Sequence, residues 1–115
     1  ACSFCQEFGI DENEMFRIAE GFGLGMGVME MCGALSGMAM IIGLSNSRGN
    51  TEEGSGSKGD TYKKLRTYIQ KFKEKNGSCI CRELKGVETG KVLCSCPQCI
   101  TDAVALTEEY LAENR

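Results

Sequence analysis

The chain has 115 residues, a formal net charge of −3, eight cysteines, and neither histidine nor tryptophan. This length supports one domain with a genuine core and leaves no room for a second. The charge excludes the basic stripe of a nucleic-acid-binding surface, and the lack of histidine excludes Cys–His dyads, mixed Cys/His zinc sites and CxxCH haem attachment. The cysteines are therefore the chemically informative residues, and they must act with one another.

The spacing of the cysteines favours metal ligation or a redox dithiol over a secreted disulfide framework. The chain contains two C-x-C pairs and two C-x-x-C pairs. Such close pairs suit a shared metal or a reactive dithiol better than cross-links between distant segments. No signal peptide is visible, although the chain opens at Ala1 rather than at a methionine. We therefore expect a cytoplasmic protein.

The N-terminal segment predicts two helices. Residues 1 to 8 form the tail of a helix that Gly9 closes. Asp11 with Glu14 then forms a capping-box-like start for a second helix. The apolar residues of this second helix at helical spacing are Met15, Ile18, Ala19 and Phe22.

Residues 21 to 44 are the most apolar stretch and carry a single charge, Glu30. The alternating glycines at its start each cost a helix about 1 kcal/mol relative to alanine, so they need a reason. A phosphate-binding loop does not explain these glycines, because the pattern G-x-G-x-x-G is not met. We expect that they allow close contact between helices. The apolar run over 31 to 44 is short for a membrane span. We predict a buried core helix over 29 to 44 and no membrane insertion.

Residues 45 to 59 are rich in glycine, serine and charged residues, which predicts a flexible polar loop. A further helix then starts at Asp60 or Thr61 and runs to Asn76. Gly77 follows as its stop signal.

Four cysteines flank an irregular excursion between Ser78 and Cys96. The last helix opens at Cys96–Pro97 and runs to about Glu113, and proline suits the first helical position. Residues 1–115 are thus predicted to form a single all-α domain, a small bundle of four to five helices with a cysteine-rich loop.

Cys96-Pro97-Gln98-Cys99 is the sharpest local motif. A C-P-x-C at a helix start puts one cysteine at the N-cap and the other in the first turn, where unpaired N–H groups and the helix dipole lower a thiol pKa. This arrangement suits a dithiol–disulfide centre, and equally a metal site, whose ligands must be deprotonated. No strand precedes the motif, so a thioredoxin-fold enzyme is not expected.

The other cysteines have a structural reading beside the functional one. We expect Cys79 and Cys94 to be bystanders in their C-x-C pairs. Cys2 and Cys5 lie three apart on a helix, so both could face one site or fill the core. A lone buried cysteine such as Cys32 can be a small hydrophobe of the core, but its place among glycine-rich packing residues favours a functional role.

CGALSG at 32–37 follows a glycine-rich run and precedes CRELKG at 81–86 and Cys99 at the start of the last helix. This order of motifs resembles the C-GCAxxG-C-C family, small redox-active proteins of bacteria and archaea named for four cysteines and a CGAxxG motif. The resemblance covers nearly the whole chain from Gly9 on. It implies a helical domain in which Cys32, Cys81 and Cys99 converge. Similar segments accompany split-Soret cytochromes, where an iron–sulfur cluster is attributed to such a domain.

The family pattern leaves the fourth site residue open. Its first cysteine lies further from a Gly-Leu-Asp-like turn than Cys2 or Cys5 lies from residues 9–11 of this chain. Either Cys2 or Cys5 takes its place, or it belongs to a segment upstream. We expect an N-terminal cysteine, Cys5, to complete the site.

These observations predict a redox protein whose site is Cys32, Cys81, Cys99 and Cys5. The first hypothesis is an iron–sulfur cluster, 2Fe–2S, that transfers electrons to a redox partner protein. The second is a thiol–disulfide protein in which Cys96 or Cys99 attacks and Cys81 or Cys32 resolves. The third is a zinc-stabilised structural module. A glycine-spaced, methionine-rich surface also suggests a homodimer.

Overall fold

The computed structural model describes residues 1–47 and 57–114, and within those ranges the fold is all-α, which confirms the predicted class. The described residues contain no strand, only an isolated antiparallel bridge between Met31 and Ile80. The elements in chain order are the 3₁₀-helix η1 (Cys2–Phe4), α1 (Cys5–Phe8), α2 (Glu12–Ala19), the 3₁₀-helix η2 (Glu20–Phe22), the π-turn η3 (Gly25–Met29), α3 (Gly33–Asn46), α4 (Lys58–Asn76), α5 (Cys81–Lys85) and α6 (Cys96–Glu113).

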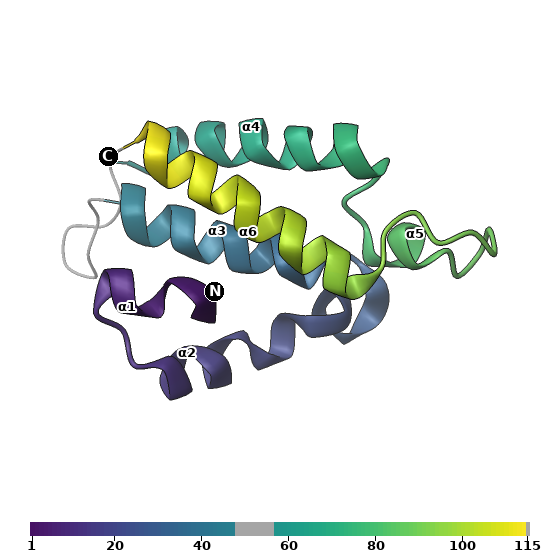
Figure 1. Ribbon diagram of the computed structural model, residues 1–115, viewed down its shortest axis with the longest axis horizontal. Coiled ribbons are helices and arrows are strands. Elements are labelled where there is room, and N and C mark those ends of the chain that lie inside the picture. The colour runs from purple at the N-terminus through teal and green to yellow at the C-terminus, as the bar shows by residue number, and fades with distance from the viewer. Residues whose placement is uncertain (48–56, 115) are drawn as a thin grey trace.

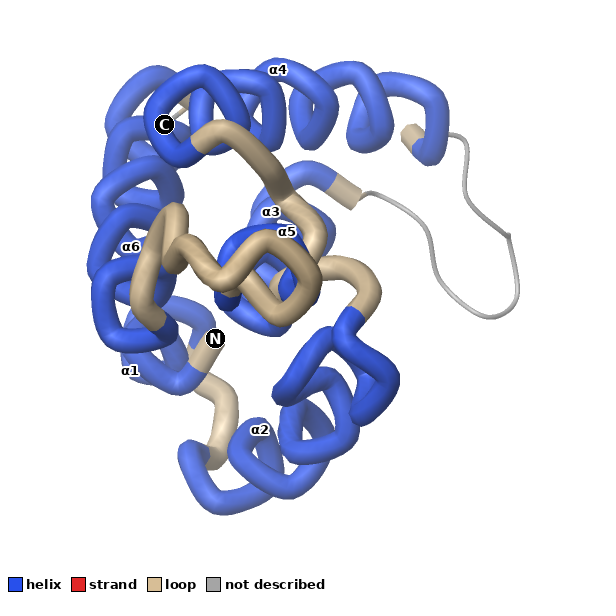
Figure 2. Tube along the Cα trace, turned by 90° about the vertical axis from the view of Figure 1, so that its right-hand side faces the viewer, coloured by secondary structure: helices blue, strands red, loops and turns tan. Residues whose placement is uncertain are grey.

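Helices α3, α4 and α6 pack against one another and form the body of the fold (Figure 1). The N-terminal α1 and α2 lie along the other side of α3, and α5 with its loop projects from one end. Seen from that end, α5 lies over the start of α3, between α2 and α4 (Figure 2). The start of α3, the end of α4, α5 and the start of α6 therefore meet at one end of the molecule.

Helix α3 supplies the centre of the core, because its apolar residues lie on every side of it. Leu35, Ile41 and Ile42 are at most 1% exposed. They pack with Phe72 of α4 and Tyr110 of α6, which are fully buried. The sequence prediction of a buried core helix is thus confirmed.

The start of that helix was predicted four residues too early, at 29 instead of 33. Leu24, Met26 and Met29 have φ angles of 53°, 60° and 58°, the left-handed region that helices of L-residues avoid. These residues turn the chain through η3 instead of continuing a helix. The chain then extends through Met31, which forms the bridge with Ile80, to Cys32, the N-cap of α3.

Most helix ends lie where local sequence signals place them. Gly9 ends α1 with φ of 65°, and Gly77 ends α4 with φ of 85°. Asp11 caps α2, because its carboxylate accepts the backbone N–H of Glu14 at 2.9 Å. These predictions are confirmed. On α2 only Met15 is buried, and Ile18 is 62% exposed, because α2 lies at the edge of the fold.

The predicted loop over 45–59 overlaps the ends of two helices, and its residues 48–56 lie outside the described residues. Helix α3 runs through Asn46, and α4 begins at Lys58 rather than at position 60 or 61. Among the described helices, none is both long and apolar enough to cross a membrane.

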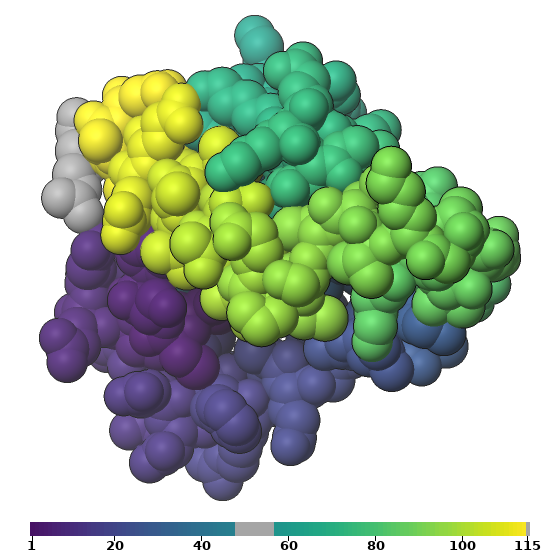
Figure 3. Space-filling view, turned by 45° about the vertical axis from the view of Figure 1, so that its right-hand side comes forward, coloured from purple at the N-terminus to yellow at the C-terminus, as the bar shows by residue number. Residues whose placement is uncertain are grey.

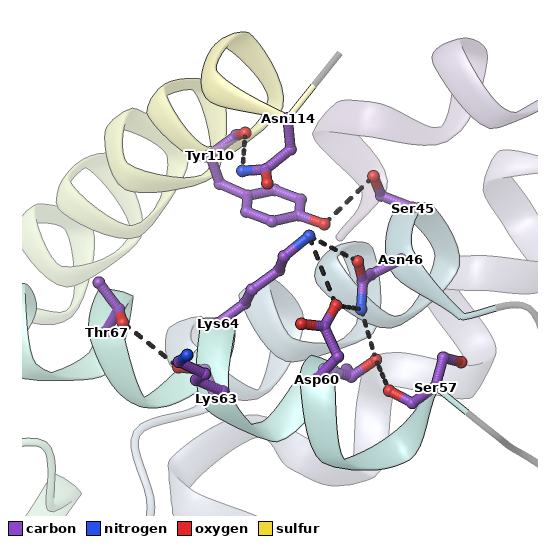
Figure 4. A network of polar contacts seen from close by, with 10 residues as sticks. Ser45, Asn46, Ser57, Asp60, Lys63, Lys64, Thr67, Tyr110 and Asn114 are labelled. Atoms are coloured by element: carbon purple, nitrogen blue, oxygen red, sulfur yellow. Dashed lines mark hydrogen bonds and ion pairs between the residues drawn. The ribbon is translucent and has the colours of Figure 1, made fainter.

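A polar network joins the end of α3 to α4 and α6 (Figure 4). The Asn46 amide donates to Asp60 at 3.1 Å and to Thr61 at 2.9 Å, and accepts from the Lys64 ammonium at 2.8 Å. The Tyr110 hydroxyl lies 3.3 Å from Ser45 Oγ. This network stabilises the end of the bundle opposite α5. The cysteine-bearing segments lie at the other end, next to α5.

Candidate functional site

A short backbone pairing brings two of the predicted site cysteines together. The N–H of Cys32 donates to the carbonyl of Cys79 at 2.9 Å, and the N–H of Cys81 donates to the carbonyl of Glu30. Between these bonds lies the bridge of Met31 with Ile80. The N-cap of α3 and the first residue of α5 are therefore held side by side, although they are far apart in the sequence.

Two glycines of the apolar stretch allow this close approach. A Cβ on Gly25 would lie 2.5 Å from the backbone nitrogen of Glu30 and 3.0 Å from Cβ of Cys81. A Cβ on Gly33 would lie 2.6 Å from the carbonyl oxygen of Phe22. No side chain fits at these distances, so close contact explains Gly25 and Gly33. A Cβ on Gly21, Gly23 or Gly27 would meet nothing within 4 Å, so the predicted close contact does not explain the other three alternating glycines.

The third predicted cysteine, Cys99, comes from the first turn of α6. Ser95 is the N-cap of this helix, and its hydroxyl accepts the N–H of Gln98 at 3.3 Å. The expectation that Cys96 caps the helix is thus wrong by one residue: Cys96 is the first helical residue and is exposed. Cys99 is 3% exposed, and its thiol donates to the carbonyl of Cys94 at 3.8 Å.

The loop after α5 carries Cys94 toward the same place. The carbonyl of Leu84 accepts the N–H groups of Leu93 and Cys94 at 3.0 and 3.2 Å. This double contact folds the loop back onto α5. Cys94 is consequently 5% exposed and lies beside Cys99 at the start of α6.

The thiols converge on a cavity of about 420 Å³. Six of the eight cysteines line it, from η1, the start of α3, α5, the loop after it and the start of α6: Cys2, Cys32, Cys81, Cys94, Cys96 and Cys99. The remaining wall is almost entirely apolar. In Figure 3 the N-terminal segment, in purple, lies against α6, in yellow-green, and these are two of the segments that enclose the cavity.

Burial dominates the electrostatics of these thiols. It raises the pKa of Cys99 above the ordinary thiol value, and side-chain contacts with Cys94 and Cys32 raise it further. Burial also raises the pKa of Cys81, although the Lys85 ammonium acts in the opposite direction. The helix start was expected to lower the pKa of Cys99, but loss of solvation outweighs the helix dipole at this position. These contacts also show that the side chain of Cys99 lies next to those of Cys32 and Cys94.

A comparison with protein-family models matches residues 1–110 to the family C_GCAxxG_C_C, described as "Putative redox-active protein (C_GCAxxG_C_C)". The chain belongs to this family. The resemblance predicted from the motif order is thus confirmed, and the protein is a cysteine-rich, all-α member of a redox-active family. No curated protein and no solved structure matches the chain.

The structure of this C_GCAxxG_C_C protein brings some predicted site residues together and leaves one out. Cys32, Cys81 and Cys99 line one cavity, and Cys96 lies at its exposed rim. Cys5 is buried but does not line the cavity; its thiol donates to the carbonyl of Ala1 at 3.9 Å. Two further cysteines line the cavity, and sequence reasoning gave them less weight: Cys2 and Cys94. Cys94 forms a C-x-C pair with Cys96, and this pair was the sequence feature that could have indicated its place at the cavity.

The donor set decides which metal groups fit. Within residues 1–47 and 57–114, no three cysteine or carboxylate side chains are grouped closely enough to hold one metal ion. Tetrahedral zinc needs its thiolates at about 2.3 Å from a single centre. An iron–sulfur cluster spreads its thiolate ligands around several irons, and soft thiolates are its usual ligands. The chemistry of the thiol donors therefore fits an iron–sulfur cluster, although the described residues do not form the close grouping that a metal centre needs.

Proposed function

We propose that the protein carries a cysteine-ligated iron–sulfur cluster, of the 2Fe–2S type, in the cavity and transfers electrons. The observation that carries this proposal is that six cysteines from separate elements line one apolar-walled space. A dithiol centre needs only two thiols, and a close-packed core leaves few voids larger than a water molecule. A cluster uses both the space and the excess of thiols.

The roles of the residues follow from their places in the fold. Cys32, Cys81 and Cys99 are proposed ligands. The fourth comes from the other lining cysteines, among which the contact of Cys94 with Cys99 favours Cys94. When bound, the cluster supplies one-electron transfer. The chain fixes the ligands through the pairing of residues 30–32 with 79–81, and its apolar walls exclude water and so tune the reduction potential.

The test is anaerobic purification followed by a visible spectrum and a count of iron and sulfide on the same sample. We expect broad absorption between roughly 320 and 600 nm, with iron present. Cys32→Ser, Cys81→Ser and Cys99→Ser should each lose iron. Cys79→Ser is the matched control, because Cys79 lies beside the cavity without lining it, and it should retain iron. Protein that stays colourless and iron-free after anaerobic reconstitution contradicts the proposal.

The C-P-Q-C motif also favours thiol–disulfide exchange as a second candidate. Cys96 is exposed at the rim, and the buried Cys99 lies three residues later in the first turn of α6. The thiolate of Cys96 would attack a substrate disulfide and release one substrate thiol. Cys99 would then attack the mixed disulfide, so that Cys96–Cys99 forms and the second substrate thiol leaves. The raised pKa of Cys99 slows this second step, because less of the thiol is ionised.

Metal-free protein distinguishes the two candidates. If the protein is a thiol–disulfide protein, iron-free samples should reduce a model disulfide, and mass spectrometry should find the Cys96–Cys99 bond afterwards. Cys96→Ser should abolish this activity, whereas Cys2→Ser should not. An iron-free protein that leaves the disulfide intact removes this candidate.

A further inference from the structure

The cavity extends well beyond the thiols. Its far half lies between α3 and α6, where the walls are Phe4, Met38, Ile41 and Val104. Thr107 also lines it, but its hydroxyl is already bonded to the carbonyl of Ala103 at 2.7 Å, so this wall offers no free donor. A volume of about 420 Å³ lies within the range of small-molecule sites, about 300–1,000 Å³, which are likewise mostly apolar with a few polar groups.

Lys85 is the one charged side chain among the described residues that line the cavity, and no carboxylate lines it. Lys85 is exposed, and it forms no salt bridge with any described residue. Its ammonium lies close enough to Cys81 to influence that thiol. The positive charge is therefore at the thiol end of the cavity, opposite the apolar half.

The rim of the cavity is also apolar, although it faces solvent. Phe16, Leu24 and Ile100 line the cavity and are 63%, 49% and 57% exposed. A ligand with an apolar body would remove this surface from water, at a gain of about 25 cal/mol per Å² of apolar area. A polar ligand such as a nucleotide or sugar would find almost no hydrogen-bonding partner along these walls.

We infer that the cavity binds a small molecule with an apolar body and one anionic group. The apolar body lies between α3 and α6 against Met38, Ile41 and Val104, and the anionic group, a carboxylate or sulfonate, lies at Lys85. This inference goes beyond the redox role, because it concerns the apolar half and Lys85.

Two fluorescent dyes with the same rings test the apolar half of the cavity and Lys85 separately. 8-Anilino-1-naphthalenesulfonate has an apolar body and one anionic group, and N-phenyl-1-naphthylamine lacks the sulfonate. Binding of each is measured by equilibrium dialysis on protein purified anaerobically and on metal-free protein, with iron counted in both. We expect saturable binding of one dye molecule per chain.

The variants test each end of the cavity. Val104→Trp fills the apolar half and should weaken both dyes at least tenfold, whereas Val92→Trp, at an exposed position off the cavity, should leave both unchanged. Lys85→Gln should weaken only the sulfonate dye, by about threefold, because exposed ion pairs are worth little. Lys91→Gln is its matched control. If Val104→Trp loses helical circular dichroism, Ala34→Leu, which also lines the cavity, replaces it in the same test.

Either of two results overturns the inference: no saturable binding of the dyes, or equal effects of the cavity variants and their controls. If Lys85→Gln weakens the binding of both dyes equally, Lys85 does not bind the anionic group of the ligand. The two proposals fail separately. Protein that binds the dyes but contains no iron supports the ligand-binding inference and contradicts the cluster. Protein that contains iron but binds no dye supports the cluster and contradicts the ligand-binding inference.

Discussion

The backbone N–H of Cys32 donates to the carbonyl of Cys79 at 2.9 Å, and this bond joins the start of the central helix to the segment that carries Cys81. Cys32 belongs to the CGAxxG motif, whereas Cys79 lines no part of the cavity. The main chain of Cys79 nevertheless helps to place the thiols, since it fixes two cysteine-bearing segments relative to each other. The same pairing requires the turn at Gly25, which lies against Cys81.

The first prediction concerns this turn. Gly25→Ala should lower the free energy of unfolding by about 1–3 kcal/mol, because the new Cβ meets the backbone of Glu30 at 2.5 Å in addition to the cost of a positive φ. Gly27→Ala is the matched control, with φ of 77° and open space around the Cβ. Urea unfolding of both variants measures the difference. A Gly25→Ala variant no less stable than Gly27→Ala contradicts the packing role.

The Gly25→Ala change should also separate the thiols, because the turn holds residues 30–32 against residues 79–81. If the cluster is present, we expect this variant to bind less iron per chain than Gly27→Ala at equal helical content. Equal iron in both variants would mean that the turn does not position the ligands.

The second prediction concerns Asp102, which lies one turn after the C-P-Q-C motif and is 4% exposed. It accepts hydrogen bonds from Lys75 at 2.8 Å, from Asn76 at 3.2 Å and from Gln98 at 2.8 Å. These bonds fasten the end of α4 to the start of α6. Asp102→Ala should destabilise the protein by about 1–3 kcal/mol, because donors lose their charged acceptor. Glu88→Ala, at an exposed ion pair, should change the melting temperature little.

The third prediction is the pH dependence of that stability. Burial alone would raise the pKa of Asp102, but the hydrogen bonds from Lys75, Gln98 and Asn76 outweigh it, and the pKa lies below its usual value. The stabilisation is therefore complete above the unfolded-state pKa, about 3.9, and is lost as the pH falls through the lower folded-state value. The melting temperature of the wild type should fall more steeply below pH 4 than that of Asp102→Asn. Parallel curves for the two proteins would refute the assignment.

The ends of most helices could be predicted because their signals are local. Gly9, Asp11 and Gly77 act on the turn next to them, and the structure uses each one as expected. The start of α3 could not be predicted in this way. Met26 and Met29 are left-handed because the chain must turn toward residue 80, which is far away in the sequence.

The candidate site likewise has one part that the sequence predicted and one part that depends on tertiary contacts. The motifs predicted that Cys32, Cys81 and Cys99 converge, and the structure places all three at one cavity. The place of Cys94 depends on the loop after α5 folding back onto Leu84, a tertiary contact with no local pattern. Cys2 likewise reaches the cavity through the packing of η1, since spacing alone does not distinguish it from Cys5.

The fourth prediction compares the reactivity of two cysteines of one motif. In metal-free protein Cys96 is exposed and Cys99 is 3% exposed with a raised pKa. Iodoacetamide should therefore modify Cys96 faster than Cys99 by at least tenfold at neutral pH, since only the accessible thiolate reacts. Peptide mass spectrometry at timed intervals measures both rates in one sample. In denaturant the two rates should become similar, and a Cys99 that reacts first in the folded protein would contradict the described burial.

The last prediction decides between the two N-terminal cysteines. Cys2 lines the cavity, whereas Cys5 is buried outside it with its thiol bonded to the carbonyl of Ala1. Cys5→Ser should lower the melting temperature, because a hydroxyl replaces a buried thiol, and yet leave iron content and dye binding at wild-type levels. Cys2→Ser should leave the melting temperature nearly unchanged and should change the iron content or the dye affinity instead. The measurements are thermal unfolding, iron content and dye affinity on both variants. Loss of iron from Cys5→Ser with retention in Cys2→Ser would return the fourth ligand to Cys5, and would require η1 and α1 to rotate when the cluster binds.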